Sequence, residues 1–508
     1  MMAKRIMFQG TSSHVGKSIL TTAFCRILKQ DGWNAAPFKA QNMALNSYVT
    51  KDGGEMGRST VAQAEAAGVD PVVEMNPVLL KPTGNSCSQV ILLGHSVGNY
   101  SARDYQDRYS QEAWKSVLRA IDYMESHFNM IVIEGAGSPA EVNLKANDIV
   151  NMRIARTMNA PVFLIADIDR GGALASIVGT LELLEPEERA LVKGLIINKF
   201  RGDITLLEPA LTFLKEKTGI PVLGVLPYLD KLGIDDEDSV SLQDIPSDHV
   251  MRDIHIAVIQ TPKISNFTDF DALAREPDVN VRFVQKGDLI GSPDLIILPG
   301  SKNTTEDLLY LHRNGYAKEI REMAENGVPV IGICGGYQMI GEKVRDPLHV
   351  ESDNDEVEGL GLLPTITTMQ GEKNTYQVEC GCSDLPFLGM RFSGNGLRAY
   401  EIHMGETVLT RPAQRLFHIT ARSGKPVDVW DGYITEKQNV FGTYCHGIFD
   451  NDELRRAVIN ALRERKGLEA LPVQFRYRAY KESEYDRLAD AVRKHFDMKE
   501  FYRILEEE

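Results

Sequence analysis

Cysteine is scarce in this sequence. Its 508 residues include six cysteines, and only Cys380 and Cys382 lie close together. There are no CxxC pairs and no dense, evenly numbered set, so neither a zinc site nor a disulfide framework is indicated. We expect reduced thiols, most of them buried. A functional cysteine therefore has to be identified from its neighbours.

Long apolar runs are also missing. No window approaches the roughly eighteen uninterrupted apolar residues of a membrane span. The N-terminal sequence lacks the long apolar stretch and the small-residue cleavage site of a signal peptide. We therefore expect no membrane segment and a cytoplasmic location. The oligomeric state is not indicated.

Positive charge is in short supply, with 56 Lys and Arg against 71 Asp and Glu and a formal net charge of −15. Affinity for a phosphate backbone needs clustered Lys and Arg, so a nucleic-acid partner is not expected. An anionic small molecule remains compatible with this composition where positive groups converge locally.

Two series of α/β patterns run along the chain. In the first half, apolar β runs alternate with helical patterns, which is typical of a doubly wound parallel sheet. The acidic, polar stretch Asp230–His249 predicts an interdomain connection, and a second α/β series follows it. We expect an α/β chain with domains at residues 1–240 and 251–450 and a helical extension at 451–508.

The expected strands carry apolar runs bounded by turn residues. In the first half they are Arg5–Gln9, Met130–Glu134, Pro161–Ala166, Gly194–Asn198 and Val222–Leu226. In the second half they are His255–Ile259, Leu295–Leu298 and Val328–Ile333, with several short β runs between Glu358 and His446. A helix is expected from Lys17 to Asp31, where apolar residues recur at helical spacing and Gly32 provides a stop.

A glycine-rich segment, Gly10–Ser18, follows the first expected strand and opens this helix. Glycines let the backbone turn tightly, so that N–H groups and the helix N-terminus face phosphate oxygens. Lys17 would reach the terminal phosphates of ATP, and the Ser18 hydroxyl would join a Mg²⁺ shell. A chance glycine-rich turn is the alternative. The other nucleotide-binding residues expected in this loop are Gly10, Thr11 and Gly16.

The loop has five residues between its glycines, where the standard motif has four. This longer form resembles the dethiobiotin-synthetase-like branch of P-loop proteins. Glu134 ends another expected strand, at the sheet edge where ligands of open α/β sheets gather. Because Mg²⁺ prefers oxygen ligands, we expect Glu134 to be a metal ligand, with a structural helix cap as the alternative.

A second candidate centre is the segment Val330–Met339, in which Cys334 is flanked at both i±2 positions by glycine. A strand, a sharp turn and a helical pattern follow one another, as in a nucleophile elbow with cysteine in the serine position. The helix N-terminus favours the thiolate. Oxyanion donors are expected from the backbone of Gly335 and from the loop at Gly300.

The proton acceptor for this cysteine is expected to be His446, which follows another β run. His403 is the second choice, and a structural histidine is the alternative for either. Cys445, next to His446, has no elbow and is expected to be buried packing.

The GICGGYQ segment with a distant histidine resembles a class I glutamine amidotransferase domain. The usual pattern of that family has a glutamate two residues after the histidine, where this chain has Ile448. The departure is typical of the subgroup that amidates cobyric and cobyrinic acids. What orients His446 therefore stays open, with Glu401 and Asp450 as candidates.

Longer motifs across nearly the whole chain resemble the glutamine-hydrolysing cobyric acid synthases of cobalamin biosynthesis. They include FKAQNMALNSYVT (Phe38–Thr50), MNPVLLKP (Met75–Pro82), DIDRGG (Asp167–Gly172) and ISNFTDFD (Ile264–Asp271). The resemblance implies ATP- and Mg²⁺-dependent amidation of the b, d, e and g carboxylates of adenosylated cobyrinic acid a,c-diamide. Glutamine would supply the nitrogen.

Several polar residues in these motifs have two interpretations each. Gln41, Asn42 and Asn46 would bind substrate amides or phosphates, or else form ordinary turns. Arg58 and Lys81 would pair with substrate carboxylates, or else be solvated surface charges. Asp148 and Asp169 would take part in metal or activation chemistry, or else cap helices. By analogy with related P-loop enzymes, Asn198, with its neighbour Lys199, would contact adenine.

The expected chemistry joins the two centres. ATP would convert a carboxylate into an acyl phosphate, and ammonia released at Cys334 would attack it along an enclosed path between the domains. A cobyrinic acid a,c-diamide synthase is the alternative within the same class. A P-loop partitioning ATPase is the alternative from another class, although it would have no use for the Cys334 elbow.

Overall fold

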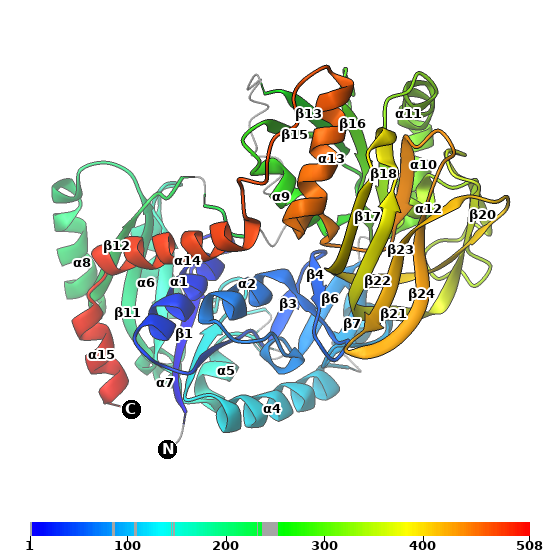
Figure 1. The fold of residues 1–508 in the computed structure, drawn as a ribbon. Helices are drawn as coiled ribbons and strands as arrows, with labels where there is room; N and C mark the ends of the chain where they lie inside the picture. The colour runs from blue at the N-terminus through cyan, green and yellow to red at the C-terminus, as the bar shows by residue number, and fades with distance from the viewer. Residues whose placement is uncertain are drawn as a thin grey trace.

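The computed structural model describes residues 3–83, 87–105, 109–143, 145, 148–230, 232–235 and 252–507. They form two α/β domains joined along a broad contact (Figure 1), which confirms the predicted fold class. Most of the expected connection Asp230–His249 lies outside the described residues. Among the described helices, none has the length and apolar character needed to cross a bilayer.

The first domain is built on a six-stranded, fully parallel sheet, as predicted. Its strand order, from edge to edge, is β12 (Val222–Pro227), β11 (Val192–Phe200), β10 (Val162–Asp167), β1 (Lys4–Gly10), β9 (Met130–Glu134) and β2 (Ala35–Phe38). Since β9 lies between β1 and β2, the chain changes direction beside β1. Ligands of open α/β sheets bind at such a switch point.

The side chains on the two faces of this sheet pack into two separate hydrophobic cores. In β1, Met7 belongs to one core, whereas Ile6 and Phe8 belong to the other. This alternation is the expected result of a strand that is buried on both faces. The first core is covered by α4 (Ser110–His127), α5 (Met152–Thr157), α6 (Ala173–Leu183) and α8 (Glu208–Thr218), and the second by α1 (Lys17–Gln30), α14 (Tyr477–Lys494) and α15 (Met498–Glu506).

The second domain has an eleven-stranded mixed sheet. Its parallel part runs β15 (Val279–Val284), β13 (Ile254–Ile259), β16 (Leu295–Leu298), β18 (Val330–Ile333) and β25 (Val440–Thr443). It continues through β24 (Lys425–Ile434), β23 (Gln414–Arg422), β21 (Thr365–Leu385), β19 (Lys343–Arg345) and β20 (Glu356–Glu358), with β22 (Phe392–Leu409) paired to β21. The helices of this domain are α9 (Asp271–Ala274), α10 (Thr304–Arg313), α11 (Tyr316–Glu325), α12 (Gly335–Met339) and α13 (Asp452–Arg465).

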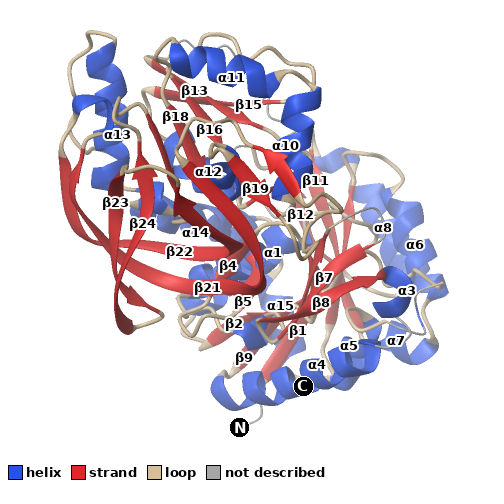
Figure 2. Cartoon of the chain, turned by 90° about the vertical axis from the view of Figure 1, so that its right-hand side faces the viewer, coloured by secondary structure: helices blue, strands red, loops and turns tan. Residues whose placement is uncertain are grey.

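The prediction of several short β runs between Glu358 and His446 is wrong in length. β21 has 21 residues and β22 has 18; Figure 2 shows both curving away from the parallel strands. Their pairing shifts register at three places. A bulge interrupts the alternation of inward and outward side chains, so one long strand has the pattern of several short ones.

The helical extension expected at residues 451–508 is divided between the domains. Leu454 and Val458 of α13 belong to the core of the second domain, whereas Leu488 of α14 and Phe501 of α15 belong to the core of the first. Figure 1 shows α14 lying across the first domain, with the two chain ends close together.

A small sheet of the first domain lies toward the second domain. Its order is β3 (Gln41–Met43), β6 (Val78–Pro82), β7 (Cys87–Leu92) and β8 (His95–Ser101), with the pair β4 (Ser47–Val49) and β5 (Glu55–Gly57) beside it. Val49 packs against Tyr400 and Ile402 of β22. The motifs between residues 38 and 82 therefore reach the second domain.

Candidate active site

The glycine-rich loop lies between β1 and α1, as predicted. Gly16 has a φ of 99°, and a Cβ there would come within 2.2 Å of the Asn198 side chain, so glycine is required on both counts. Lys17 Nζ donates to the carbonyls of Ser12 and Gly137, each at 3.0 Å. The lysine therefore curls over the loop toward the position that a terminal phosphate would take.

Asn198 and Lys199 hold this loop from β11, which β10 separates from β1 in the sheet. Asn198 Nδ2 donates to the Val15 carbonyl at 2.8 Å, and Lys199 Nζ donates to the His14 carbonyl at 2.7 Å. The backbone N–H of Thr11 donates a hydrogen bond to the Ile165 carbonyl of β10.

Glu134 is buried at the end of β9 and faces the start of α1. Ser18 Oγ donates to its Oε1 at 2.8 Å, Lys39 Nζ lies 2.9 Å from the same oxygen, and Gln63 Nε2 donates to Oε2 at 2.5 Å. The two residues predicted to bind Mg²⁺ are thus adjacent, and Lys39 and Gln63 are partners that the sequence did not reveal. Within the described ranges, no group of three or more His, Cys, Asp or Glu side chains is arranged to hold a metal.

A cavity of about 460 Å³ opens beside the loop, within the size range of small-molecule sites. Its walls include Gly137, the apolar side chains of Met43 and Leu80, and the predicted substrate residues Gln41 and Asp148. Gln41 Oε1 accepts a hydrogen bond from the Tyr105 hydroxyl at 2.6 Å. Asp148 accepts the backbone N–H groups of Val150 and Asn151 at 2.8 and 2.9 Å, which is a capping arrangement ahead of α5.

Cys334 lies in the second domain between β18 and α12, with φ 52° and ψ −107°. A cysteine rarely adopts a positive φ, and glycines relieve the crowding that the turn creates. A Cβ on Gly336 would lie 1.9 Å from the Leu298 carbonyl oxygen, and one on Gly332 would lie 2.6 Å from that of Gly336. The predicted elbow is thus present, with the sulfur at the head of a short helix.

The loop expected to supply the second oxyanion donor also lies at this turn. A Cβ on Gly335 would come within 2.7 Å of the Ser301 nitrogen, and one on Gly300 would come within 3.1 Å of His446 Cε1. The backbone at Gly335, the strand β17 (Gly300–Ser301) and the imidazole therefore surround one small space.

His446 is completely buried, and its ring is held by Asp269. Nδ1 lies 2.6 Å from Asp269 Oδ2, and the other oxygen of this carboxylate accepts the Gly447 N–H at 2.9 Å. The ring stacks on Tyr400 at 5.1 Å. Burial lowers the pKa of His446, but Asp269 and a hydrogen bond with Cys334 outweigh burial and raise it to about 10.

Neither residue suggested by the sequence orients this ring. Glu401 is bound by Arg422 at 2.7 and 2.9 Å, and Nδ1 is occupied by Asp269 rather than by Asp450. Asp269 belongs to the ISNFTDFD motif but is 177 residues from His446. The resemblance marked this motif, although nothing in its spacing assigned a role to the carboxylate.

His403 faces the Cys334 cavity, and no carboxylate among the described residues binds its ring. Its Nδ1 lies 2.8 Å from the Gly405 carbonyl and its ring stacks on Tyr444 at 3.8 Å. Burial lowers the pKa of His403 to about 4, so this ring is neutral at physiological pH. Cys445 is buried, as predicted.

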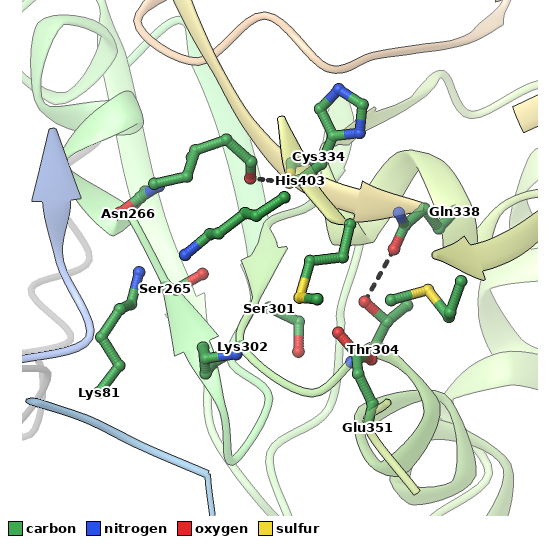
Figure 3. Close-up of a pocket in the computed structure, with 14 residues that line it drawn as sticks. Lys81, Ser265, Asn266, Ser301, Lys302, Thr304, Cys334, Gln338, Glu351 and His403 are labelled. Carbon is green, nitrogen blue, oxygen red and sulfur yellow. Dashed lines mark hydrogen bonds between the residues drawn. The ribbon is translucent and has the colours of Figure 1, made fainter. Parts of the chain in front are cut away.

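The cavity beside Cys334 is lined by residues of both domains (Figure 3). Lys81 reaches it from β6 of the first domain, and Lys302 and Lys373 come from the second. Glu55 binds Lys81 at 2.8 Å and Lys373 at 2.5 Å. Lys81, predicted to bind a substrate carboxylate, thus lies beside the cysteine rather than in the larger cavity.

The remaining predicted residues lie apart from both cavities. Arg58 forms a buried ion pair with Asp235 at 2.6 Å. Asp169 is exposed and lies 3.1 Å from Arg201. Asn42 is buried, and its Nδ2 has no hydrogen-bond partner within the described part of the chain. Asn46 accepts the N–H of Phe267 from the second domain at 3.2 Å.

Comparisons with known proteins agree with this geometry. The family described as the CobQ/CobB/MinD/ParA nucleotide binding domain matches residues 6–241, and the CobB/CobQ-like glutamine amidotransferase domain matches residues 255–454. A cobyric acid synthase from Moorella thermoacetica is 55% identical over 98% of this chain and 96% of its own. Another, from Pelotomaculum thermopropionicum, is 54% identical over 99% and 97%. With such identity over both domains, the chain belongs to the cobyric acid synthase family of glutamine-dependent amidoligases.

Proposed function

We propose that this chain amidates the b, d, e and g carboxylates of adenosylated cobyrinic acid a,c-diamide, with ATP as the source of energy and glutamine as the source of nitrogen. The observation that carries the proposal is that a P-loop and a Cys–His–Asp centre occur in one chain, with a first-domain lysine in the wall of the cysteine cavity. A partitioning ATPase would have no use for the second centre.

At the second centre, Cys334 would attack the carboxamide carbon of glutamine. His446 would take the thiol proton and return it to the departing ammonia, leaving a glutamyl thioester that water hydrolyses. Asp269 would keep the ring in position and stabilise its charged form. The backbone N–H groups near Gly335 and Gly300 would stabilise the oxyanion.

At the first centre, a substrate carboxylate would attack the terminal phosphate of ATP and release ADP, and ammonia would then attack the acyl carbon and displace inorganic phosphate. Lys17 and the loop N–H groups would position the phosphates. The oxygens of Ser18 and Glu134, 2.8 Å apart, fit the ligand preference of Mg²⁺, which would neutralise phosphate charge when bound. The large cavity, whose walls combine apolar side chains with charged ones such as Lys145, Asp148 and Glu188, would take the corrinoid edge that carries the carboxylate.

The test is incubation of the chain with ATP, Mg²⁺, glutamine and the corrinoid diamide, followed by product masses. Four carboxyl-to-amide conversions are expected. Addition of amides only at other carboxylates, or no amide at all, would contradict the proposal.

Two variants separate the centres. Cys334→Ala is expected to lose glutamine hydrolysis but to make product from added ammonium. Lys17→Ala is expected to lose synthesis from either nitrogen source while keeping basal glutamine hydrolysis. If Cys334→Ala retained glutamine-dependent synthesis, the assignment of the nucleophile would be wrong.

A further inference from the structure

Lys302 and Glu351 are two charged side chains in the wall of the Cys334 cavity. Lys302 follows Ser301 of β17, whose backbone nitrogen lies beside the elbow. Glu351 comes from the loop after β19, where the Asp346 carboxylate accepts three backbone N–H groups, including that of Glu351 at 2.8 Å. Both side chains lie below Cys334 in the view of Figure 3.

Hydrogen bonds connect Glu351 to the helix that follows Cys334. The Thr304 N–H donates to Glu351 Oε2 at 2.6 Å, and Thr304 Oγ1 donates to Gln338 Oε1, in α12, at 2.8 Å. Since Cys334 comes directly before α12, the carboxylate has a fixed position relative to the sulfur. No described residue donates a hydrogen bond to the other oxygen, Oε1, so Glu351 keeps one oxygen for a ligand.

The three lysines of this cavity differ in their partners. Lys81 and Lys373 both bind the buried Glu55, so their charges are compensated. In the described part of the chain, no carboxylate, carbonyl or hydroxyl binds the Lys302 ammonium. A charged group in the wall of a cavity gains most from a ligand of opposite charge. Lys302 is therefore the cation that fits an anionic ligand group.

Lys302 and Glu351 attract each other, although no ion pair joins them among the described residues. Burial lowers the pKa of Lys302 despite the attraction of Glu351. Burial also raises the pKa of Glu351 to about 7 despite the attraction of Lys302. Both charged forms consequently gain when a ligand brings opposite charge into the cavity. One cation and one anion beside Cys334 match the carboxylate and the ammonium of a free α-amino acid.

We propose that Lys302 and Glu351 determine which amide Cys334 attacks, by binding the two α-groups of glutamine. The Lys302 ammonium pairs with the α-carboxylate, and Glu351 Oε1 accepts a hydrogen bond from the α-ammonium. The carboxamide at the other end of the molecule then lies at the sulfur. The inference rests on the proposed function, in which glutamine is the source of nitrogen.

Glutamine makes room for itself as it enters. The cavity has a volume of about 30 Å³, which is enough for roughly two water molecules. Met369 and Met404 line it, and unbranched methionine side chains adapt to the shape of a ligand. The Lys302 side chain is also free to turn, because no partner among the described residues holds its ammonium.

The test measures hydrolysis of three amides by the full chain, without ATP or corrinoid. Glutamine carries both α-groups, γ-aminobutyramide lacks the α-carboxylate, and glutaramate lacks the α-ammonium. For the wild type, kcat/KM is expected to be roughly ten- to hundredfold lower for either analogue than for glutamine. The reason is that each analogue leaves one charged group of the cavity without a partner.

Lys302→Met and Glu351→Gln are expected to change specificity in opposite directions. Lys302→Met should raise KM for glutamine roughly tenfold, with little change in kcat. It should lose the preference for glutamine over γ-aminobutyramide and keep the preference over glutaramate. Glu351→Gln, whose amide oxygen can still accept the Thr304 N–H, should lose only the preference over glutaramate. Lys302→Arg keeps the charge and should keep both preferences.

Lys318→Met and Glu322→Gln are the matched controls, because this exposed pair on α11 is 3.6 Å apart in the same domain. They should change no preference. Alkylation of Cys334, followed by peptide mass, gives a second readout. Iodoacetamide has no α-groups and should react at the wild-type rate in every variant. A diazoketone analogue of glutamine should need roughly tenfold higher concentrations in Lys302→Met and Glu351→Gln.

An equal loss of kcat/KM for all three amides, preferences unchanged from the wild type, or slower reaction with iodoacetamide would overturn the roles of Lys302 and Glu351. Hydrolysis and alkylation need neither ATP nor corrinoid. The expected changes in a chain that makes no corrinoid amide would therefore support these roles and count against the proposed function alone.

Discussion

Asp269 holds the ring of His446, the proposed base of the second centre. Its two oxygens bind the His446 ring and the Gly447 N–H. Asp269→Asn is expected to reduce glutamine hydrolysis by roughly two orders of magnitude or more, because the ring loses the charge that supports its protonated form. Synthesis from added ammonium, measured in parallel, is expected to persist. Equal loss of both reactions would show that the substitution damages the fold instead.

The contact between Asp269 and His446 also predicts the pH above which glutamine hydrolysis slows. Burial lowers the pKa of His446, while Asp269 and Cys334 raise it to about 10. With a raised pKa, the imidazolium that protonates departing ammonia is present below about pH 10 and is lost as pH rises through this value. Initial rates of hydrolysis are expected to fall there, and in Asp269→Asn at a lower pH. An unmoved alkaline limit would assign it to another group.

Short motifs predicted those parts of the site whose geometry depends only on residues close together in the sequence. The Gly10–Ser18 loop and the Cys334 elbow could be anticipated because glycine spacing and the strand-to-helix transition lie within a few residues of each other. Asp269 could not be assigned in the same way, since its contact with His446 closes across 177 residues. No periodicity within either segment carries that information.

Among the elements, α15 contributes unexpectedly to the first domain. Phe501 is fully buried and contacts the rings of Phe24 and Phe163 at 4.9 and 5.6 Å. Phe501→Ala is expected to lower the free energy of unfolding of the first domain by about 3–5 kcal/mol. Denaturant titration of the full chain, following the first-domain transition, would measure it.

The control for this substitution is Phe213→Ala on α8, where the ring is 48% exposed. It is expected to stay within about 0.5 kcal/mol of the wild type. If both variants lost the same stability, burial by α15 would not be the cause.

The apolar stripes of α14 and α15 indicate helices with one buried face, but a stripe does not say which surface covers it. The prediction of a terminal extension was therefore possible, whereas its docking on the first domain was not. The long strands β21 and β22 could not be predicted as single strands. Their bulges interrupt the alternation of inward and outward side chains, although the backbone pairing continues past each bulge.

For the whole molecule, the placement of the Cys334 cavity predicts where the released ammonia goes. Lys81 of the first domain and Lys373 of the second both line it, and both bind the buried Glu55. Burial, with the neighbouring lysines, lowers the pKa of Lys373 to about 7 despite the attraction of Glu55. The same surroundings disfavour ammonium and keep ammonia in its neutral, nucleophilic form.

Ammonia released into this space is therefore expected to be captured before it equilibrates with solvent. With unlabelled glutamine and ¹⁵N-ammonium in the medium, the product of the wild-type chain should carry little ¹⁵N by mass. Cys334→Ala, which depends on the medium, should give fully labelled product. Lys373→Ala removes part of the wall and should raise the labelled fraction in glutamine-driven synthesis. A wild-type product labelled in proportion to bulk ammonium would mean that nitrogen crosses between the domains through solvent, and that the shared cavity plays no part in the transfer.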